Sequence, residues 1–332
     1  MQSQTEISSG PAHTGAASEL AFMRPPERPL FTQVFMLPGG YVDGEGVVHR
    51  EVELAPVTGF DEELLDSIGP AVCSAHLVTA LLSRCLKRVG NHAPVTTSLV
   101  RDLLINDRDF LMWKLRELTL GKRVRAMIVC SDAKCAQSMD VVLNLDDLMP
   151  AARPVDRCVF TFDVTEDGKN FELAFRLPAG ADQEACAEFV RDDPFPAVNH
   201  LLARIVQRIG DNCAIDEHAI NALSPGVLSA LERGIEELAP LAAIDIEAAC
   251  VECGRPSVSP LDVTSFFLNE LQHNRRMLER EVHFIAWHYH WPEREILALT
   301  RRKRRRYIDL IQGDSTAAFH ADWIVATLPA NS

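Results

Sequence analysis

Two pairs of cysteines are the residues of this chain whose spacing predicts chemistry. Cys130 and Cys135 lie in "VCSDAKCAQ", and Cys250 and Cys253 lie in "ACVECGRP". Two thiolates on one tight turn form a zinc knuckle, and a tetrahedral zinc ion needs two knuckles, with Zn–S distances of about 2.3 Å. The second pair, which is followed directly by glycine, is typical of a knuckle. The first pair has a longer loop, and no glycine follows Cys135.

Together, the four cysteines predict one structural zinc site. Four thiolates leave no open coordination position, so such a site stabilises the fold and has no catalytic role. Two alternatives stay open at this point, namely reduced, partly buried cysteines without metal and a redox-active pair. The chain has nine cysteines, and its polar N-terminus lacks an apolar signal core, which favours reduced thiols over disulfides.

An internal duplication would bring the two cysteine pairs together. The segment "LLSRCLKRVG" begins at residue 81 and "LLARIVQRIG" begins at residue 201, which gives an offset of 120 residues (201 − 81). The same offset superposes Cys130 on Cys250. If both copies share one fold and pack around a pseudo-two-fold axis, we expect their cysteine tips to meet.

Hydrophobic periodicity assigns the elements of each copy. Residues 78–89 and 198–209 each carry apolar residues at helical spacing, and we predict that these helices end at Gly90 and Gly210. Alternating apolar residues before and after each cysteine pair predict a β-hairpin with the cysteines at its tip. The predicted fold class is α+β, internally duplicated, with a helical C-terminal extension.

The sequence predicts four parts. We expect a flexible polar tail over residues 1–30, two α+β repeats over 31–150 and 151–275, and a helical docking segment over 276–332. In the last part, the Pro at position 292 predicts a break between a long helix and a basic helix. The candidate partner-binding residues there are aromatic or charged: Trp287, His288, Tyr289, His290, Trp291, Arg301, Arg302, Lys303, Arg304, Arg305 and Arg306.

Charge and motifs limit the function classes. The net charge of −14 argues against broad binding of nucleic acid, so we expect the basic run to dock on an acidic partner or on the acidic body of the chain. No apolar run approaches the length of about 18 residues that a membrane helix needs. Phosphate-binding, dinucleotide-binding and nucleophile-elbow motifs are missing from the sequence, so we expect no enzyme and no small-molecule substrate.

Two stretches of the sequence resemble known families. The segments "REVELAPVTGFDEELL" and "NDRDFLMWKLRELTLG", with the cysteine hairpin, resemble the baseplate proteins of T-even-like tailed phages and related contractile injection systems, over roughly residues 31–275. The segment "REVHFIAWHYHWPEREILALTRRKRRRYIDLI" resembles small proteins of extracellular contractile injection clusters and short phage tail-assembly chaperones.

The resemblance implies a structural component or assembly factor of a baseplate or tail, with other baseplate or tail proteins as partners. It implies assembly in the cytoplasm and leaves retention in the finished particle open. The alternative is a zinc-containing nucleic-acid-binding module that uses the basic run 301–306. A metal hydrolase is disfavoured because four thiolate ligands close the metal site.

Overall fold

The structure of this chain is a computed structural model that combines helices with small, mainly antiparallel sheets, so the fold is α+β. The predicted tail over residues 1–30 lies outside the described residues. Among the described residues, no helix is both long and apolar enough to span a membrane. The described residues are 31–68, 72–148, 159–166, 169–187, 189, 194–238, 243–272, 275–313 and 326–328.

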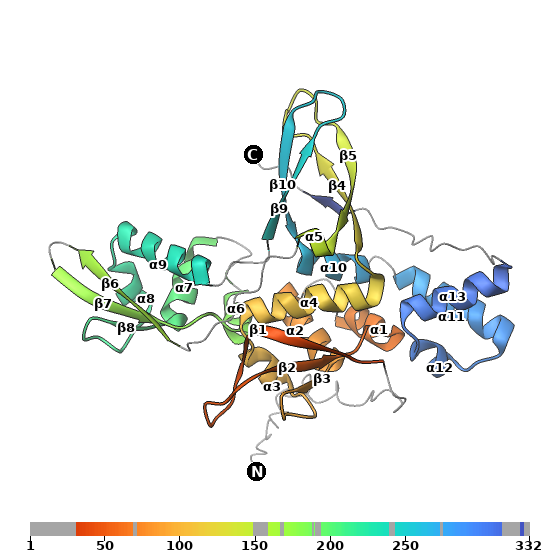
Figure 1. Ribbon diagram of the computed structural model, residues 1–332, viewed down its shortest axis with the longest axis horizontal. Coiled ribbons are helices and arrows are strands. Elements are labelled where there is room, and N and C mark those ends of the chain that lie inside the picture. Colours follow the sequence, from red (N-terminus) through yellow and green to blue (C-terminus); the bar gives the residue numbers. More distant parts are fainter. Residues whose placement is uncertain are drawn as a thin grey trace, which may run out of the picture.

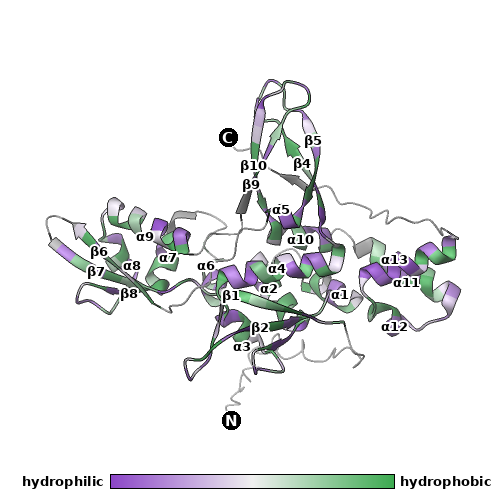
Figure 2. Cartoon of the chain, viewed as in Figure 1, coloured by the Kyte–Doolittle hydropathy of each residue, from purple (hydrophilic) through white to green (hydrophobic). Residues whose placement is uncertain are grey.

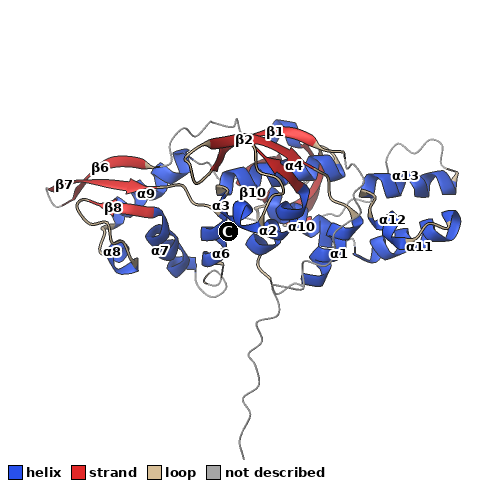
Figure 3. Cartoon of the chain, turned by 90° about the horizontal axis from the view of Figure 1, so that it is seen from below, coloured by secondary structure: helices blue, strands red, loops and turns tan. Residues whose placement is uncertain are grey.

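The first unit packs four helices against a three-stranded sheet of order β1-β2-β3. Its core includes Leu81 and Leu82 from α2 and Leu111 from α4, all almost fully buried. Figure 3 shows this sheet covering one side of the helices. The elements are β1 (Gln33–Val42), β2 (Val48–Leu54), α1 (Gly59–Ile68), α2 (Ser74–Cys85), β3 (Leu86–Val89), α3 (Thr97–Asp102) and α4 (Ile105–Leu120).

The second unit has the same order of elements around a sheet of order β6-β7-β8. Asp216 caps α8 by accepting the backbone N–H of Ala219 at 2.8 Å, and Pro225 is the first residue of α9. The elements are β6 (Phe160–Glu166), β7 (Lys169–Phe175), α6 (Gly180–Cys186), α7 (Pro194–Ile205), β8 (Val206–Ile209), α8 (Glu217–Asn221) and α9 (Pro225–Leu238).

The prediction that two helices end at Gly90 and Gly210 is wrong, because each helix ends five residues before its glycine and the chain becomes a strand. In the first unit, β3 pairs with β2, and Arg88 binds the carboxylates of Glu51 and Glu53 across the pair. Gly90 and Gly210 then turn the chain after the strand, with positive φ values of 52° and 57°. Pairing with the neighbouring strand therefore decides the structure here, although the apolar residues continue at helical spacing.

Two further hairpins stack on one another and project from the body (Figure 1). Their facing sides form one apolar cluster that includes Ala126, Ile128, Ile246 and Leu261. The strands are β4 (Arg123–Val129) with β5 (Ser138–Asn144), and β9 (Ala243–Ala249) with β10 (Pro256–Asp262). The strand β11 (Ala326–Leu328) pairs parallel to β4, and the helices α5 (Leu145–Leu148) and α10 (Val263–Gln272) follow the two hairpins.

The C-terminal segment forms a helical unit at one end of the molecule (Figure 1). The break expected at Pro292 is present, because this proline is the N-cap of the second helix. Ile285, Ile296 and Ile308 form the core of the unit. Its helices are α11 (Arg275–Tyr289), α12 (Glu293–Leu297) and α13 (Arg301–Gln312).

The same kind of contact joins the units twice. The backbone N–H of Gly180, at the start of α6, donates to the carbonyl of Leu103 at 2.9 Å, just before α4. Likewise, the N–H of Gly59 at the start of α1 donates to the carbonyl of Leu299 at 3.3 Å, just before α13. A Cβ at Gly59 would lie 2.9 Å from the Cα of Leu297, so the close approach requires glycine.

Candidate metal centre and docking segment

Four cysteine sulfurs meet at the tips of the two projecting hairpins. Cys130 and Cys135 lie between β4 and β5, and Cys250 and Cys253 lie between β9 and β10. All four Sγ atoms lie within 4.8 Å of one another. The Sγ atoms of Cys130 and Cys253 are 3.6 Å apart, and those of Cys135 and Cys250 are 3.7 Å apart. Each of these short distances therefore joins the two hairpins.

The sulfur distances fit a four-thiolate metal site. All four thiols are free, and the distances are far longer than the S–S bond of about 2.05 Å in a disulfide. Four sulfurs arranged as a regular tetrahedron around an ion, with bonds of about 2.3 Å, lie about 3.8 Å from each other. Thiolates are soft ligands, which select zinc, copper(I) or iron–sulfur clusters over magnesium or calcium. The residues present therefore fit a structural zinc ion.

Both tips use a left-handed residue directly after the second cysteine. Gly254 has a φ of 72°, and its N–H donates to the carbonyl of Cys250 at 2.8 Å. In the other tip Ala136 takes this place with a φ of 44°, and its N–H donates to the carbonyl of Asp132 at 2.9 Å. The first pair, which lacks the glycine of the second, thus reaches a similar turn at the expense of a strained alanine.

The thiols of the cluster differ in acidity. Backbone N–H groups of Cys253 and Glu252 lower the pKa of Cys250 to about 7. The pKa of Cys135 is raised to about 12, since burial and the three neighbouring thiols outweigh a lowering hydrogen bond from the backbone of Gln137. Cys250 is therefore more acidic than Cys135, and a bound dication would stabilise the thiolate form of the ligands.

Contacts that need no metal also hold the two tips together. The backbone N–H of Ser131 donates to the Oγ of Ser257 at 3.1 Å, and the guanidinium of Arg255 lies 3.1 Å from the carboxylate of Asp132. Cys130 and Cys250 are each only 3% exposed. The four sulfurs are therefore positioned by the surrounding fold, with the more exposed Cys253 at the outer side.

The family model of the T4 bacteriophage base plate protein matches residues 50–268. The chain belongs to the T4 bacteriophage base plate protein family. No curated protein and no solved structure matches it. Membership in this baseplate family confirms the resemblance that residues 31–275 indicated, and it supports a structural role in a phage baseplate. The match covers both cysteine pairs, and it ends before the C-terminal helical unit.

The basic run of this baseplate-family chain is split between its interior and its surface. Arg301 is 8% exposed and Arg304 is 0% exposed, so neither can contact a partner directly. Arg304 donates to the carboxylates of Glu62 at 2.7 Å and Glu281 at 2.8 Å, and Arg305 also contacts Glu281. The contact with Glu62 of α1 docks α13 on the first unit, and the contacts with Glu281 of α11 hold it within the C-terminal unit. Three residues of the run remain exposed, Arg302, Lys303 and Arg306, on a helix that is mainly hydrophilic (Figure 2).

The aromatic residues before Pro292 also include both exposed and partly buried side chains. Trp287 is 70% exposed, and His288 and His290 are also exposed. Trp291 is partly buried and stacks on Tyr289, with ring centroids 5.1 Å apart. Trp291 therefore anchors the helical unit internally, whereas Trp287 presents its indole to solvent.

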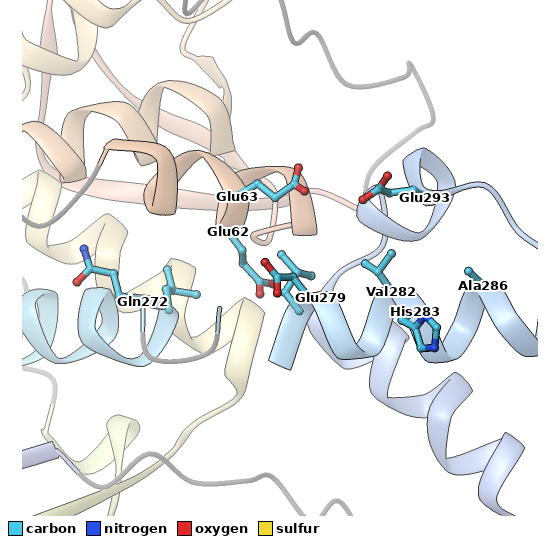
Figure 4. A pocket seen from close by; sticks show the side chains of 10 residues that line it. Glu62, Glu63, Gln272, Glu279, Val282, His283, Ala286 and Glu293 are labelled. Atoms are coloured by element: carbon cyan, nitrogen blue, oxygen red, sulfur yellow. The ribbon is translucent and has the colours of Figure 1, made fainter. Parts of the chain in front are cut away.

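Sequence reasoning did not identify an acidic cavity at the junction of the C-terminal unit with the first unit. The cavity, of about 580 Å³, is lined by residues of α1, α10, α11 and α12. Glu63 and Glu293 face one another across it, with Glu279 and His283 nearby (Figure 4). Burial and the charge of Glu293 raise the pKa of Glu63. These carboxylates come from separate helices, and no sequence motif links them.

Proposed function

We propose that this protein is a structural component or assembly factor of the baseplate of a contractile phage tail or contractile injection system, assembled in the cytoplasm and held together by a shared structural zinc. The ligands are the four clustered thiols: Cys130, Cys135, Cys250 and Cys253. The observation that carries the proposal is the thiol cluster inside the region matched by the baseplate family. The sulfur–sulfur contacts of 3.6 and 3.7 Å each join cysteines that are more than 100 residues apart in the sequence.

Zinc would act here through the fold. When bound, it supplies four bonds that link residues distant in sequence, and its binding free energy adds to the stability of the folded state. A closed thiolate shell offers no position for water or substrate. The site therefore supports a rigid structural part rather than an enzyme.

An internal duplication explains why two cysteine pairs meet, and we propose repeats over residues 31–150 and 151–275, followed by the segment 276–332. The starts of α2 and α7 support it, since they differ by 120 residues (194 − 74), as do those of β4 and β9 (243 − 123). Matching ion pairs support it too. Arg84 binds Asp61 at 2.6 Å, and Arg204 binds Asp182 at 2.9 Å. Asp61 lies in the first turn of α1, and Asp182 lies in the first turn of α6.

The C-terminal unit is proposed to dock on another baseplate or tail protein. The exposed indole of Trp287 supports this, because aromatic side chains at interface centres contribute roughly 2 kcal/mol or more each. Arg302, Lys303 and Arg306 would orient an acidic partner and affect association rate more than affinity. The burial of Arg301 and Arg304 reduces the basic surface on which the nucleic-acid alternative depends.

The shared zinc is tested by metal content. Full-length protein, purified under reducing conditions and desalted, should retain one tightly bound zinc, and Cys130→Ser and Cys253→Ser should each lose all of it. Cys213→Ser is the matched control, because this cysteine is exposed and outside the cluster. Retention of zinc in either ligand variant would refute a shared four-thiolate site.

The baseplate role is tested by association. Tagged protein should recover identified baseplate or tail proteins from cells that express the complete tail gene cluster, and Trp287→Ala should reduce that recovery. Recovery of none of them by the wild-type protein would refute the proposal. Equal recovery by the variant would remove Trp287 from the interface.

A further inference from the structure

Three side chains of types that can bind metals meet at one end of the first unit's sheet, where β1 ends, β2 begins and β3 ends. Asp43 follows β1, His49 lies in β2, and His92 follows β3. One ligand atom from each lies within 4.8 Å of the others. The Oδ2 atom of Asp43 is 2.8 Å from the Nε2 of His49 and 4.0 Å from the Nε2 of His92. The carboxylate is hydrogen-bonded to His49 and lies near His92, so the three potential ligand atoms form one cluster.

The fold holds the first two groups in place. The Oδ1 atom of Asp43 accepts the backbone N–H groups of Glu45 and Val47, both at 2.9 Å, which leaves Oδ2 directed at the imidazoles. The His49 ring lies against Gly90, where a Cβ would be only 2.3 Å from its Nδ1 atom. The carboxylate and the His49 ring are thus fixed before any ligand binds.

His92 carries an unsatisfied nitrogen that points at the same place. Its Nε2 atom is shielded from solvent, and no described residue offers it a hydrogen bond. The ring is held edge-on against His49 at 4.8 Å and against Tyr41 at 5.3 Å, measured between centroids. A shielded polar atom without a partner carries a desolvation penalty. An ion between this nitrogen and the carboxylate would remove that penalty.

The turn that carries His92 does not need an imidazole. In the first unit, Val89 and His92 exchange two backbone hydrogen bonds, at 3.1 and 2.8 Å. In the second unit, Ile209 and Asn212 exchange the same two bonds, at 2.9 and 3.0 Å. The same turn therefore forms with asparagine, so the backbone geometry of the turn does not account for the imidazole of His92.

We propose that Asp43, His49 and His92 form a second metal site, separate from the cysteine cluster, for a divalent transition-metal ion of the zinc type. Imidazole ligands favour such ions, whereas magnesium and calcium prefer all-oxygen sites. Ligand atoms about 2.0–2.1 Å from a tetrahedral ion lie about 3.3 Å apart. The two distances from the Asp43 carboxylate, 2.8 and 4.0 Å, bracket this value, and all three ligand atoms lie within 4.8 Å of one another.

The proposed ion has an entry route and a structural effect. The His92 side chain is 37% exposed, whereas those of His49 and Asp43 are 9% and 16% exposed, so the ion enters beside His92. Three protein ligands leave a fourth position for water or a partner's side chain. The bound ion ties the β1–β2 turn to the turn after β3, at the end of the sheet.

The test uses full-length protein that keeps its tightly bound metal, with Zn²⁺ added in a calorimetric titration and Mg²⁺ as the hard-cation comparison. We expect one further zinc per chain, no magnesium binding, and about a tenfold or greater loss of zinc affinity in His92→Asn and in Asp43→Asn. His218→Asn, at an exposed histidine of α8, should bind as the wild type does.

Two outcomes would overturn the proposal. One is the absence of a further zinc, and the other is unchanged affinity in both ligand variants. His92→Asn places in this turn the residue that Asn212 provides in the second unit, so the variant keeps a side chain compatible with the turn. A readout without mutation is hydrogen exchange of residues 43–47 in the wild type, which zinc should slow. Exchange that zinc leaves unchanged would contradict the site.

Discussion

Replacing Arg304 with alanine should lower the free energy of unfolding by about 3–5 kcal/mol, the usual loss when one partner of a buried ion pair is removed. The side chain is 0% exposed and donates to Glu281 at 2.8 Å, to Glu62 at 2.7 Å and to the carbonyl of Leu299 at 2.9 Å. Its removal takes the ion-pair partner at 2.7 Å away from the buried Glu62 and leaves Glu281 with Arg305. Because Glu62 belongs to α1 and Glu281 to α11, the loss falls on the junction of the C-terminal unit with the body.

Urea denaturation followed by circular dichroism measures the loss, and hydrogen exchange locates it. Arg306→Ala is the matched control, because this arginine of the same helix is exposed and its loss should change stability by about 0.5 kcal/mol or less. Arg304→Lys should be intermediate, since lysine keeps the charge without the planar fork. Equal stability of the Arg304→Ala and Arg306→Ala variants would refute the assignment of Arg304 as the buried junction residue.

Three further changes test other parts of the fold. Gly59→Ala should destabilise by about 1–3 kcal/mol in urea denaturation, because its Cβ would overlap the backbone of α12, whereas Gly44→Ala, with nothing within 4 Å, is the neutral control. Ala136→Gly should stabilise the zinc-loaded protein by about 1 kcal/mol in thermal denaturation, since it relieves a left-handed alanine; a lower melting temperature would contradict this. Burial raises the pKa of Asp109 to about 6, above its unfolded value, so its ionisation weakens folding progressively between about pH 4 and 6. Asp109→Asn should therefore gain stability relative to the wild type on going from pH 4 to pH 7, and a constant difference would contradict the shift.

Local signals in the sequence predict part of the fold well. The apolar period and Pro292 are enough to place the helices on either side of the C-terminal break. The change from helix to strand after Cys85 could not be predicted in this way, because Leu86 and Val89 continue the helical stripe and are equally suited to the buried face of a strand. Pairing with β2 decides between the two, and that pairing is a tertiary contact.

Sites built from residues that are distant in the sequence could likewise be predicted only in part. The offset between the two copies predicts that four thiols could meet, and their sulfurs do lie together. Within the basic run, Arg301 and Arg304 lie three residues apart on one helical face, but only the position of Glu62 and Glu281 determines that this face is buried. Asp43, His49 and His92 follow no recognised spacing, and only the sheet brings them together.

A metal bound at the thiol cluster would change the path along which the chain transmits tension. Cys130 and Cys253 are 123 residues apart in the sequence, yet their sulfurs lie 3.6 Å apart. With a metal bound at this point, the intervening residues form a closed loop that contains the whole second unit. Tension applied between the segment before β4 and the segment after β10 would then pass through the metal–sulfur bonds and the stacked hairpins. The second unit lies within the closed loop, so it would not transmit this tension.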